Sequence, residues 1–251
     1  MRILFLEITG KCQLECTHCY AESGPDGDHG SMSTEEWRQV IDQGAEAGME
    51  LVQFIGGEPT LHPDLLPLMR HALSRGLEVE VYSNLVHITE EMWEVFSAPG
   101  VRLATSYYSD RAGEHTRITK RNTHERTRRN ISEAVRRGIP MRAGIVDVHD
   151  SQRVAKAEEE LRELGVTRIR HDRVRGVGRG GAGREPNMSQ LCGRCGNGRL
   201  AVSASGDVWP CVFSRWRSVG NVRQTPLPEI LAGSALEEFS TELQNRSPQV
   251  R

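Results

Sequence analysis

The chain has 251 residues, of which 37% are hydrophobic and 26% are charged, and 32 basic residues against 34 acidic ones give a formal net charge of −2. This size allows one substantial domain with a small appendage, and the balanced charge gives no overall attraction to nucleic acid or to a membrane surface. No apolar run approaches the roughly 20 residues that cross a membrane, and the N-terminal apolar run is too short for a secretory signal. We therefore expect a cytoplasmic protein without a membrane partner.

Strand-like apolar runs alternate with amphipathic helix-like runs up to residue 170. In chain order, strands are predicted over residues 3–9, 51–55, 78–82, 101–105, 141–146 and 166–170, and helices over 33–48, 63–74, 89–97, 122–137 and 151–164. Ser33 and Glu36 have the spacing of a capping box, and Gly76, Gly138 and Gly165 are typical helix stops. Such repeats predict a parallel sheet with right-handed crossovers. Because six units are too few for a closed eight-fold barrel, we expect an α/β fold with an open, partial (β/α)6 TIM-like barrel.

A cysteine motif directly follows the first predicted strand. Cys12, Cys16 and Cys19 have the spacing C-x3-C-x2-C, and they lie where reactive groups gather in parallel sheets, at the carboxyl end of a strand. Three thiolates leave one coordination position open, which favours a reactive iron–sulfur site over a structural metal site. A zinc site that borrows a distant fourth ligand is the alternative. The six cysteines fall into two groups of three, which argues against a disulfide framework.

The sequence changes character after residue 170. Residues 173–184 are rich in glycine and arginine and predict a flexible linker. Strands are then predicted over residues 199–203 and 207–209, joined by a turn at Ser205 and Gly206. A last helix is predicted over residues 227–243, with Phe239 and Leu243 packed inward.

The predicted hairpin brings a second group of three cysteines together. It returns Cys211 towards Cys192 and Cys195, which makes a second three-thiolate site. An iron–sulfur cluster is favoured there, but zinc competes because C-x2-C pairs are common in zinc sites. We expect a barrel over residues 1–171, a connector over 172–190 and a small hairpin-plus-helix domain over 191–251.

Basic residues outnumber acidic ones between residues 111 and 142. We interpret this stretch as a helix face exposed to solvent. The alternative is a patch that receives an acidic peptide or a phosphate, whereas the scarcity of aromatic residues argues against single-stranded nucleic acid. The basic residues concerned are Arg117, Lys120, Arg121, Arg126, Arg128, Arg129, Arg136 and Arg137.

The first cysteine group and its flanks resemble the radical S-adenosylmethionine (SAM) superfamily over residues 1 to about 171. This family has C-x3-C-x2-C after the first strand of a partial (β/α)6 barrel, so the resemblance implies that Cys12, Cys16 and Cys19 hold a [4Fe–4S] cluster whose open iron binds SAM. Further SAM contacts are implied for residues after the strands, although Leu85 stands where the family often has glycine. These residues are Gly56, Gly57, Glu58 and Pro59 for the amino group, His18 and Tyr20 as nearby rings, and Ser83, Asn84 and Ser106 for the carboxylate or ribose.

The second cysteine group resembles the opening half of a SPASM domain, a C-terminal extension that holds auxiliary iron–sulfur clusters. The spacing Cys195-x10-Gly206-x4-Cys211 fits its opening motif, and no cysteine follows Cys211. The resemblance therefore implies a truncated, twitch-like form with at most one auxiliary cluster, at Cys192, Cys195 and Cys211. This layout is also similar to molybdenum-cofactor biosynthesis enzymes of the superfamily, in which substrate binds the auxiliary cluster.

The resemblance implies a radical SAM oxidoreductase or maturase. Such an enzyme reductively cleaves SAM to a 5′-deoxyadenosyl radical, which abstracts a hydrogen atom from substrate, and it needs an electron donor such as flavodoxin or ferredoxin. Our first hypothesis is modification of a ribosomally synthesised peptide, and the alternative is a dehydrogenase or rearrangement enzyme for a small aminoglycoside-type molecule. A zinc-bound scaffold without SAM chemistry is a third possibility, which the intact motifs disfavour. The substrate-facing candidates are His115, His124, Asp147 and His149, and no catalytic acid or base is assigned.

Overall fold

The computed structural model of the protein describes residues 1–246. Its strands are β1 (Ile3–Thr9), β2 (Leu51–Gly56), β3 (Glu78–Tyr82), β4 (Val101–Tyr107), β5 (Met141–Asp147), β6 (Arg168–Arg173), β7 (Arg199–Val202), β8 (Asp207–Trp209) and β9 (Gly220–Asn221). Its α-helices are α1 (Thr34–Glu46), α2 (Leu65–Ser74), α3 (Glu90–Phe96), α4 (Ala112–Thr119), α5 (His124–Arg136), α6 (Val154–Glu163), α7 (Leu227–Leu231) and α8 (Ser234–Arg246). Three short 3-10 helices, η1 (Pro59–Leu61), η2 (Gly178–Gly181) and η3 (Met188–Gln190), lie in the connections.

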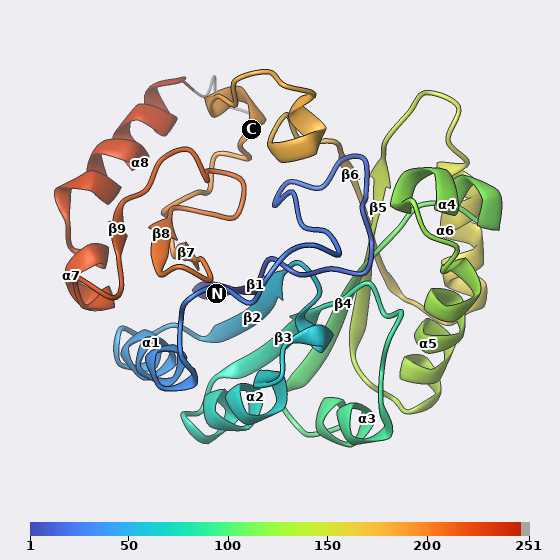
Figure 1. Ribbon diagram of the computed structural model, residues 1–251, viewed down its shortest axis with the longest axis horizontal. Coiled ribbons are helices and arrows are strands. Elements are labelled where there is room, and N and C mark those ends of the chain that lie inside the picture. The colour runs from blue at the N-terminus through green and yellow to red at the C-terminus, as the bar shows by residue number, and fades with distance from the viewer. Residues whose placement is uncertain (247–251) are drawn as a thin grey trace.

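The nine strands within residues 1–246 form one curved sheet in the order β6-β5-β4-β3-β2-β1-β7-β8-β9. Strands β1 to β6 are parallel, as predicted for a partial barrel, and helices surround the outer face while the loop after β1 enters the interior (Figure 1). Strand β7 adds to β1 in parallel, and β8 and β9 continue the sheet antiparallel. The predicted hairpin therefore extends the barrel sheet itself.

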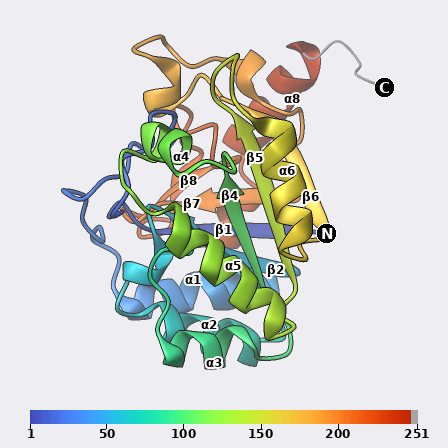
Figure 2. The same ribbon diagram turned by 90° about the vertical axis from the view of Figure 1, so that its right-hand side faces the viewer.

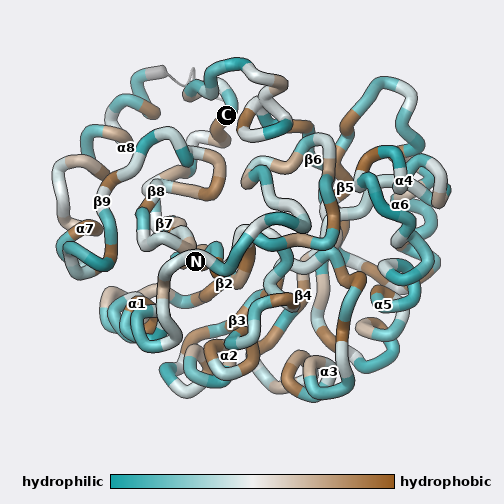
Figure 3. Tube along the Cα trace, in the orientation of Figure 1, coloured by the Kyte–Doolittle hydropathy of each residue, from teal (hydrophilic) through white to brown (hydrophobic). Residues whose placement is uncertain are grey.

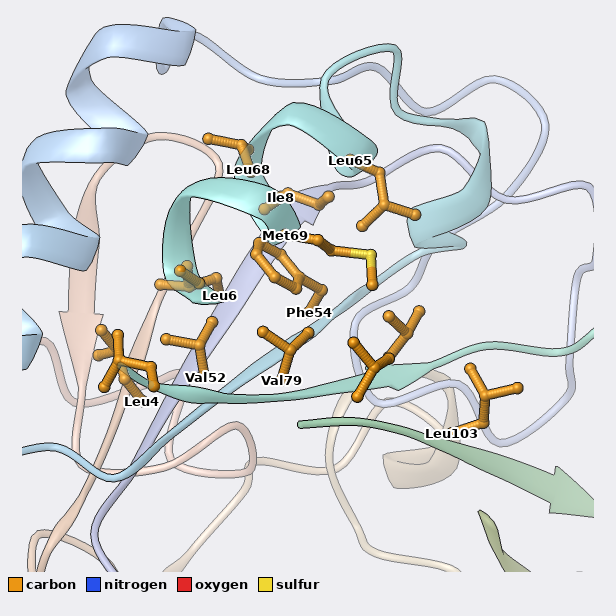
Figure 4. Packing of buried hydrophobic residues seen from close by; sticks show 14 of the residues in the cluster. Leu4, Leu6, Ile8, Val52, Phe54, Leu65, Leu68, Met69, Val79 and Leu103 are labelled. Carbon is orange, nitrogen blue, oxygen red and sulfur yellow. The ribbon is translucent and has the colours of Figure 1, made fainter. Parts of the chain in front are cut away.

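Side-chain alternation separates two faces of each strand. Leu4, Leu6 and Ile8 of β1 are fully buried against α2, where they meet Phe54 of β2 and Met69 of α2 (Figure 4). The alternate residues of the same strand point into the barrel interior. Figure 3 shows that hydrophilic residues run along α5 and α6, which cover β4 to β6 from outside.

The structure departs from the predicted elements at several places, among them two helical segments. Helix α4 was not predicted, because its sequence AGEHTRIT offers few apolar residues, and only Ile118 is an aliphatic residue buried there. The single helix predicted over residues 227–243 is two helices, α7 and α8, which break at Ala232 and Gly233. Phe239 and Leu243 are nevertheless buried as expected. The end of the predicted domain 191–251, residues 247–251, lies outside the described residues.

None of the helices within residues 1–246 combines the length and the hydropathy that a membrane span requires. Seen from the side, α4 lies at the end of the barrel where the parallel strands finish (Figure 2). The loop after β1 reaches the same end, because the amide nitrogens of Glu15 and Thr17 bond to the carbonyl oxygens of Thr119 and Ile118, at 3.1 and 2.9 Å. Helix α4 thus supports the loop that carries the first cysteine group.

Candidate functional site

The first three cysteines lie in the loop after β1, at the carboxyl end of the barrel strands. Cys12 is buried, with its amide nitrogen 2.9 Å from the carbonyl oxygen of Gly24, and Cys16 and Cys19 are partly exposed. Burial raises the pKa of Cys12 and of Cys16 to about 12, with a further contribution from the Glu58 carboxylate at Cys12 and from the Cys19 thiol at Cys16. Such thiols ionise when a bound metal supplies positive charge. The donor set of three adjacent thiols on a reactive rim therefore fits an iron–sulfur cluster with one open iron.

The cysteine sulfurs are not arranged around one point. Within residues 1–246, no three His, Cys, Asp or Glu side chains are placed to hold a single metal ion. In a cluster, by contrast, each thiolate binds its own iron. The spread of the three thiols is therefore compatible with a cluster.

Two glycines bring the end of β2 into contact with the cysteine loop. Gly56 has a φ of 120°, and a Cβ there would lie 2.5 Å from the carbonyl oxygen of Thr9. A Cβ on Gly57 would lie 2.2 Å from the carbonyl oxygen of Lys11. The amide nitrogens of Gly57 and Glu58 bond to these same carbonyl oxygens, at 2.7 and 2.8 Å. Only glycine permits this approach, so the motif Gly56-Gly57 fixes the start of the cysteine loop.

Glu58 joins the ends of β2 and β3. One carboxylate oxygen accepts from the Thr60 hydroxyl at 2.8 Å and from the Ser83 hydroxyl at 2.7 Å, and the other accepts from the Asn84 amide nitrogen at 2.7 Å. Burial raises the pKa of Glu58 above its ordinary value, although these donors oppose the shift. Protein donors thus occupy both oxygens, and Glu58 holds Ser83 and Asn84 in place beside the cysteine loop.

Asn84 lies against the first cysteine. Its Nδ2 is 3.7 Å from the Cys12 sulfur, and its amide group also bonds to the side chain of Gln13. The next residue, Leu85, has a φ of 56°, the left-handed conformation that favours glycine, and its side chain is fully buried. Leu85 therefore adopts a backbone conformation that glycine favours, while its side chain contributes to the hydrophobic core.

Polar side chains lie near the cysteine loop. Nδ1 of His18 is buried without a hydrogen bond among the described residues, and the buried hydroxyl of Tyr20 faces the carboxylate of Glu7. The ring of His18 packs edge-on against Tyr108, with centroids 5.2 Å apart. Ser106 is partly buried, and its hydroxyl lies 3.0 Å from that of Tyr82. These groups give the site capacity to bind a polar ligand.

Of the four predicted substrate-facing residues, the structure brings His115 and His124 together, with ring centroids 5.4 Å apart, and leaves Asp147 away from them. His115 and His124 are buried in the packing of α4 and α5 on β4, where Nε2 of His124 is 2.9 Å from the Tyr107 hydroxyl. Burial lowers the pKa of His115 to about 4. Asp147 is exposed at the end of β5, and Nε2 of His149 lies 3.8 Å from a carboxylate oxygen of Glu114.

Acidic side chains neutralise much of the basic stretch over residues 111–142. Glu133 pairs with both Arg136 and Arg137, and Glu160 pairs with Arg128. Arg121 pairs with Glu15 of the cysteine loop. Most of this stretch is thus an ion-paired helix surface, as the first interpretation predicted.

The second cysteine group flanks the hairpin of β7 and β8, since Cys192 and Cys195 precede β7 and Cys211 follows β8. Cys195 and Cys211 are buried with their sulfurs 2.8 Å apart, whereas Cys192 is exposed. The contact with Cys195 lowers the pKa of Cys192 to about 5. Met188, Phe239 and Leu243 pack around the two buried thiols, together with the partly buried Leu191 and Phe213. Helix α8 and η3 thus build the apolar shell of a second three-thiol site.

A buried ionic contact that the sequence did not reveal lies between the two cysteine groups. The guanidinium of Arg215, four residues after Cys211, bonds to the carboxylate of Glu7 on β1. It also lies over the ring of Trp209, 4.3 Å from the centroid. Tyr20, directly after Cys19, packs against Phe213 with centroids 5.2 Å apart. The sequence offered one signal for this contact. Glu7 is the single acidic residue in the apolar strand β1, and a buried carboxylate needs a partner.

The prediction of a flexible linker over residues 173–184 is wrong. The segment contains η2 and packs on the first cysteine loop, where Arg179 bonds to the carbonyl oxygens of Cys16 and Ser23. Sequence alone favoured a linker because glycine and arginine are typical of exposed chain. The contacts that order the segment come from residues more than 150 positions away.

Two family models match the chain. One, described as the radical SAM superfamily, covers residues 6–161, and one described as an iron–sulfur cluster-binding domain (SPASM) covers residues 192–250. A protein of Methanosarcina barkeri named AdoMet-dependent heme synthase is 29% identical over 167 residues, 65% of this chain and 48% of its own. A PqqA peptide cyclase of Xanthomonas campestris pv. campestris is 29% identical over 195 residues, 75% of this chain and 52% of its own. The chain thus spans about half the length of these curated relatives.

The fold is also similar to solved structures. Streptococcus suis SuiB, solved bound to the precursor peptide SuiA, superimposes with a TM-score of 0.79 at 12% sequence identity. The superposition covers 95% of this chain and 66% of SuiB. At this identity the similarity shows the fold.

Proposed function

Because the chain belongs to the radical SAM superfamily, and a SPASM model matches residues 192–250 after the barrel, we propose that it is an enzyme that modifies a ribosomally synthesised peptide. The observation that carries the proposal is the position of the first cysteine loop on the barrel rim. The close backbone contacts of Gly56 and Gly57 and the hydrogen bonds of Glu58 to Ser83 and Asn84 hold it there. In support of a peptide substrate, one relative is named a peptide cyclase and one structural neighbour was solved with a precursor peptide.

Cys12, Cys16 and Cys19 would hold a [4Fe–4S] cluster on this rim. When bound, the cluster and SAM supply one-electron cleavage of SAM and removal of a hydrogen atom from substrate. Carbonyl oxygens of the segment Gly56-Gly57-Glu58-Pro59 would accept from the SAM amino group, since the amide nitrogens of Gly57 and Glu58 already bond to the cysteine loop. Ser83 and Asn84 would be oriented by Glu58 towards the carboxylate or ribose.

The residues around the rim would bind and enclose the cofactor. His18 offers a buried polar atom that a ligand can satisfy, Tyr20 offers an aromatic ring, and Ser106 offers a hydroxyl from the end of β4. The aromatic rings of Tyr20, Tyr108 and Phe213 would exclude water from the space between the two cysteine groups.

Cys192, Cys195 and Cys211 would hold one auxiliary iron–sulfur cluster. Such a cluster supplies a site that accepts an electron from the substrate or binds the substrate directly. The exposed position of Cys192 leaves this site open on one side, whereas Cys195 and Cys211 are enclosed. The proposed partners are a peptide substrate and a one-electron donor such as flavodoxin or ferredoxin.

A small-molecule substrate, such as an aminoglycoside-type alcohol, is the second candidate. The observation in its favour is that another relative is named a heme synthase, a name that refers to a small molecule. The two candidate functions can be distinguished by testing which substrate class is modified when the enzyme cleaves SAM.

The proposal can be tested by anaerobic reconstitution followed by iron counting and a SAM-cleavage assay. Two clusters correspond to about eight irons per chain, and about four are expected for Cys12→Ala or Cys211→Ala. Reduced protein with full iron that fails to cleave SAM would refute the enzymatic proposal. Mass spectrometry would then be used to screen two sets of substrates. One set is precursor peptides encoded near the gene, and the other is aminoglycosides. A mass change confined to the aminoglycosides would overturn the peptide assignment.

A further inference from the structure

The segment between the two cysteine groups contacts both of them. Residues 173–184 are the glycine- and arginine-rich part of the connector predicted over 172–190, and the name connector refers to this part from here on. They run from the end of β6 towards Cys192. On one side the connector packs on the loop that carries Cys16 and Cys19. On the other side it bonds to Gln190, two residues before Cys192.

Arg179 makes the contacts with the first cysteine loop. Its Nε donates to the carbonyl oxygen of Cys16 at 2.8 Å, and its Nη2 donates to that of Ser23 at 2.7 Å. Its backbone nitrogen donates to the carbonyl oxygen of Cys19 at 3.0 Å. One residue therefore ties three points of the loop, two of which are cysteines of the first group.

The close fit of the connector depends on glycine. Gly178 has a φ of 55°, and a Cβ there would lie 2.4 Å from the carbonyl oxygen of Tyr20 and 2.6 Å from that of Cys19. A Cβ on Gly180 would lie 3.2 Å from the carbonyl oxygen of His18. The backbone of the loop and the backbone of the connector are thus in direct contact, and no side chain fits between them.

The first residues of the connector bond to Gln190, two residues before the second cysteine group. The amide nitrogen of Gly176 bonds to Oε1 of Gln190 at 2.7 Å, and Nη1 of Arg175 bonds to its carbonyl oxygen at 3.0 Å. Close by, Met188 packs on Cys195 and Cys211. A continuous set of contacts therefore runs from the second cysteine group to the carbonyl oxygens of the first.

We propose that Arg179 is a positioning residue that holds the first cysteine loop in its ligand-presenting conformation. Through the connector, the order of this loop depends on the docking of the second cysteine group. Arginine suits this role because its planar guanidinium donates in two fixed directions, whereas lysine offers a single ammonium. The part of the proposal that concerns iron rests on the proposed function, and the part that concerns loop order does not.

Hydrogen exchange of the metal-free full chain tests loop order directly. For Arg179→Ala, we expect amides of residues 11–24 to exchange at least tenfold faster, since two charge-assisted hydrogen bonds are lost. The amides of β2 to β4 should keep their wild-type rates. The matched control is Arg184→Ala, since Arg184 lies in the same connector but bonds only to the carbonyl oxygen of Gly181 in its own turn. Wild-type exchange of residues 11–24 in folded Arg179→Ala would overturn the proposal.

Two further variants keep the proposal testable if Arg179→Ala does not fold. Arg179→Lys retains the charge and the backbone bond, so we expect exchange rates between those of the wild type and Arg179→Ala. Gly178→Ala keeps Arg179 but separates the two backbones, and it should raise exchange in the same residues. A folded Arg179→Lys protein that exchanges like the wild type would contradict the role assigned to the two-directional guanidinium.

Iron retention provides the second measurement. After reconstitution and chelator treatment, Arg179→Ala should lose about half of its iron, from the first site. The electron paramagnetic resonance change that SAM causes in the wild type should weaken in proportion. A substitution that merely lowered global stability would release iron from both sites, which would refute the local role. If the wild type bound no iron, the proposed function would fail, while the exchange data would still decide the role of Arg179.

Discussion

The side-chain amides of Gln13 and Asn84 form a reciprocal pair. Nε2 of Gln13 donates to Oδ1 of Asn84 at 3.1 Å, and Nδ2 of Asn84 donates to Oε1 of Gln13 at 3.2 Å. This pair joins the loop between the first two cysteines to the end of β3. Since Glu58 holds the Asn84 backbone, the ends of three strands are connected through one amide.

Removing either amide should destabilise the protein, and the two losses should not add. Asn84→Ala also leaves the amide nitrogen of Val86 without its acceptor, so we expect a loss of about 2 kcal/mol in the free energy of unfolding. Gln13→Ala should cost about 1 kcal/mol, and the double variant should cost less than the sum. Urea unfolding of the metal-free chain measures these values, with exposed Asn197→Ala as the control. Strict additivity would show that the pair contributes nothing.

Leu85 should respond to substitution in an order opposite to that of a helical leucine. Leu85→Ala removes a buried side chain and should cost about 3 kcal/mol. Leu85→Gly loses the same packing but relieves the left-handed backbone, so it should be more stable than the alanine variant by up to about 1 kcal/mol. Buried Leu68 of α2 is the control, because glycine there should be about 1 kcal/mol worse than alanine. The same order at both positions would contradict the strain at Leu85.

Glu80 should be a major determinant of barrel stability. Its buried carboxylate accepts from Arg102 at 3.2 Å and from Arg142 at 2.7 Å, and it also contacts Gln53. Burial acts to raise the pKa of Glu80, but these partners outweigh burial and hold the pKa below its ordinary value. Its contribution is therefore present above pH ~4.5 and is lost as pH falls through the lower pKa of the folded state.

The variant Glu80→Gln leaves two arginines without their carboxylate. We expect a loss of about 3 kcal/mol at pH 7, and a smaller decline of stability than the wild type shows below pH ~4.5. Urea midpoints between pH 7 and 3 measure both effects, with exposed Glu163→Gln as the control. If Glu80→Gln and the wild type lost stability equally in acid, the ionised Glu80 carboxylate would not be the source of the acid sensitivity.

His115 should make the fold sensitive to mild acid. Burial lowers its pKa to about 4, with a further contribution from His124, so the unfolded chain binds more protons than the native chain between pH 4 and ~6.5. Stability should therefore be complete above pH ~6.5 and fall as pH drops towards 4, by at most about 3 kcal/mol from this residue. His115→Phe keeps the ring contacts with Tyr108 and His124 and should flatten the slope.

The slope should not vanish in that variant. Burial also lowers the pKa of His62 to about 4, and that residue is unchanged. The control is His87→Phe, because His87 is exposed. This variant should show the same dependence of stability on pH as the wild type. An unchanged slope for His115→Phe would show that His115 does not carry this sensitivity.

Local sequence signals predicted the barrel because each strand and helix has its own boundary chemistry. Residues 3–9 and 78–82 form β1 and β3 as predicted, and Ser33 and Glu36 form the predicted capping box. Helix α4 was missed because its burial depends on the cysteine loop above it, and not on an apolar stripe of its own. Local patterns report such helices poorly.

The sequence reveals those features of the candidate site that lie within a few residues of one another. It does not reveal the contacts between residues that are distant in the chain. The cysteine spacing and the glycines of β2 are visible within a few residues. The pairing of Glu7 with Arg215 joins positions 208 apart, and the bond from Arg179 to Cys16 joins positions 163 apart. Pairings at such separation leave no periodic signal in the chain. They become visible only when the sheet brings β1, the connector and the second cysteine group together.

The pairing of β1 with β7 has a consequence for how the protein assembles. Ile3 is paired with Arg199 across the sheet, so β1 receives its second neighbour only after residue 202 has left the ribosome. Until then, one edge of β1 has no strand partner, and Glu7 lacks Arg215. Such late, non-local pairing slows folding. A nascent chain therefore presents the first cysteine loop on an incomplete sheet until the second cysteine group has also been synthesised.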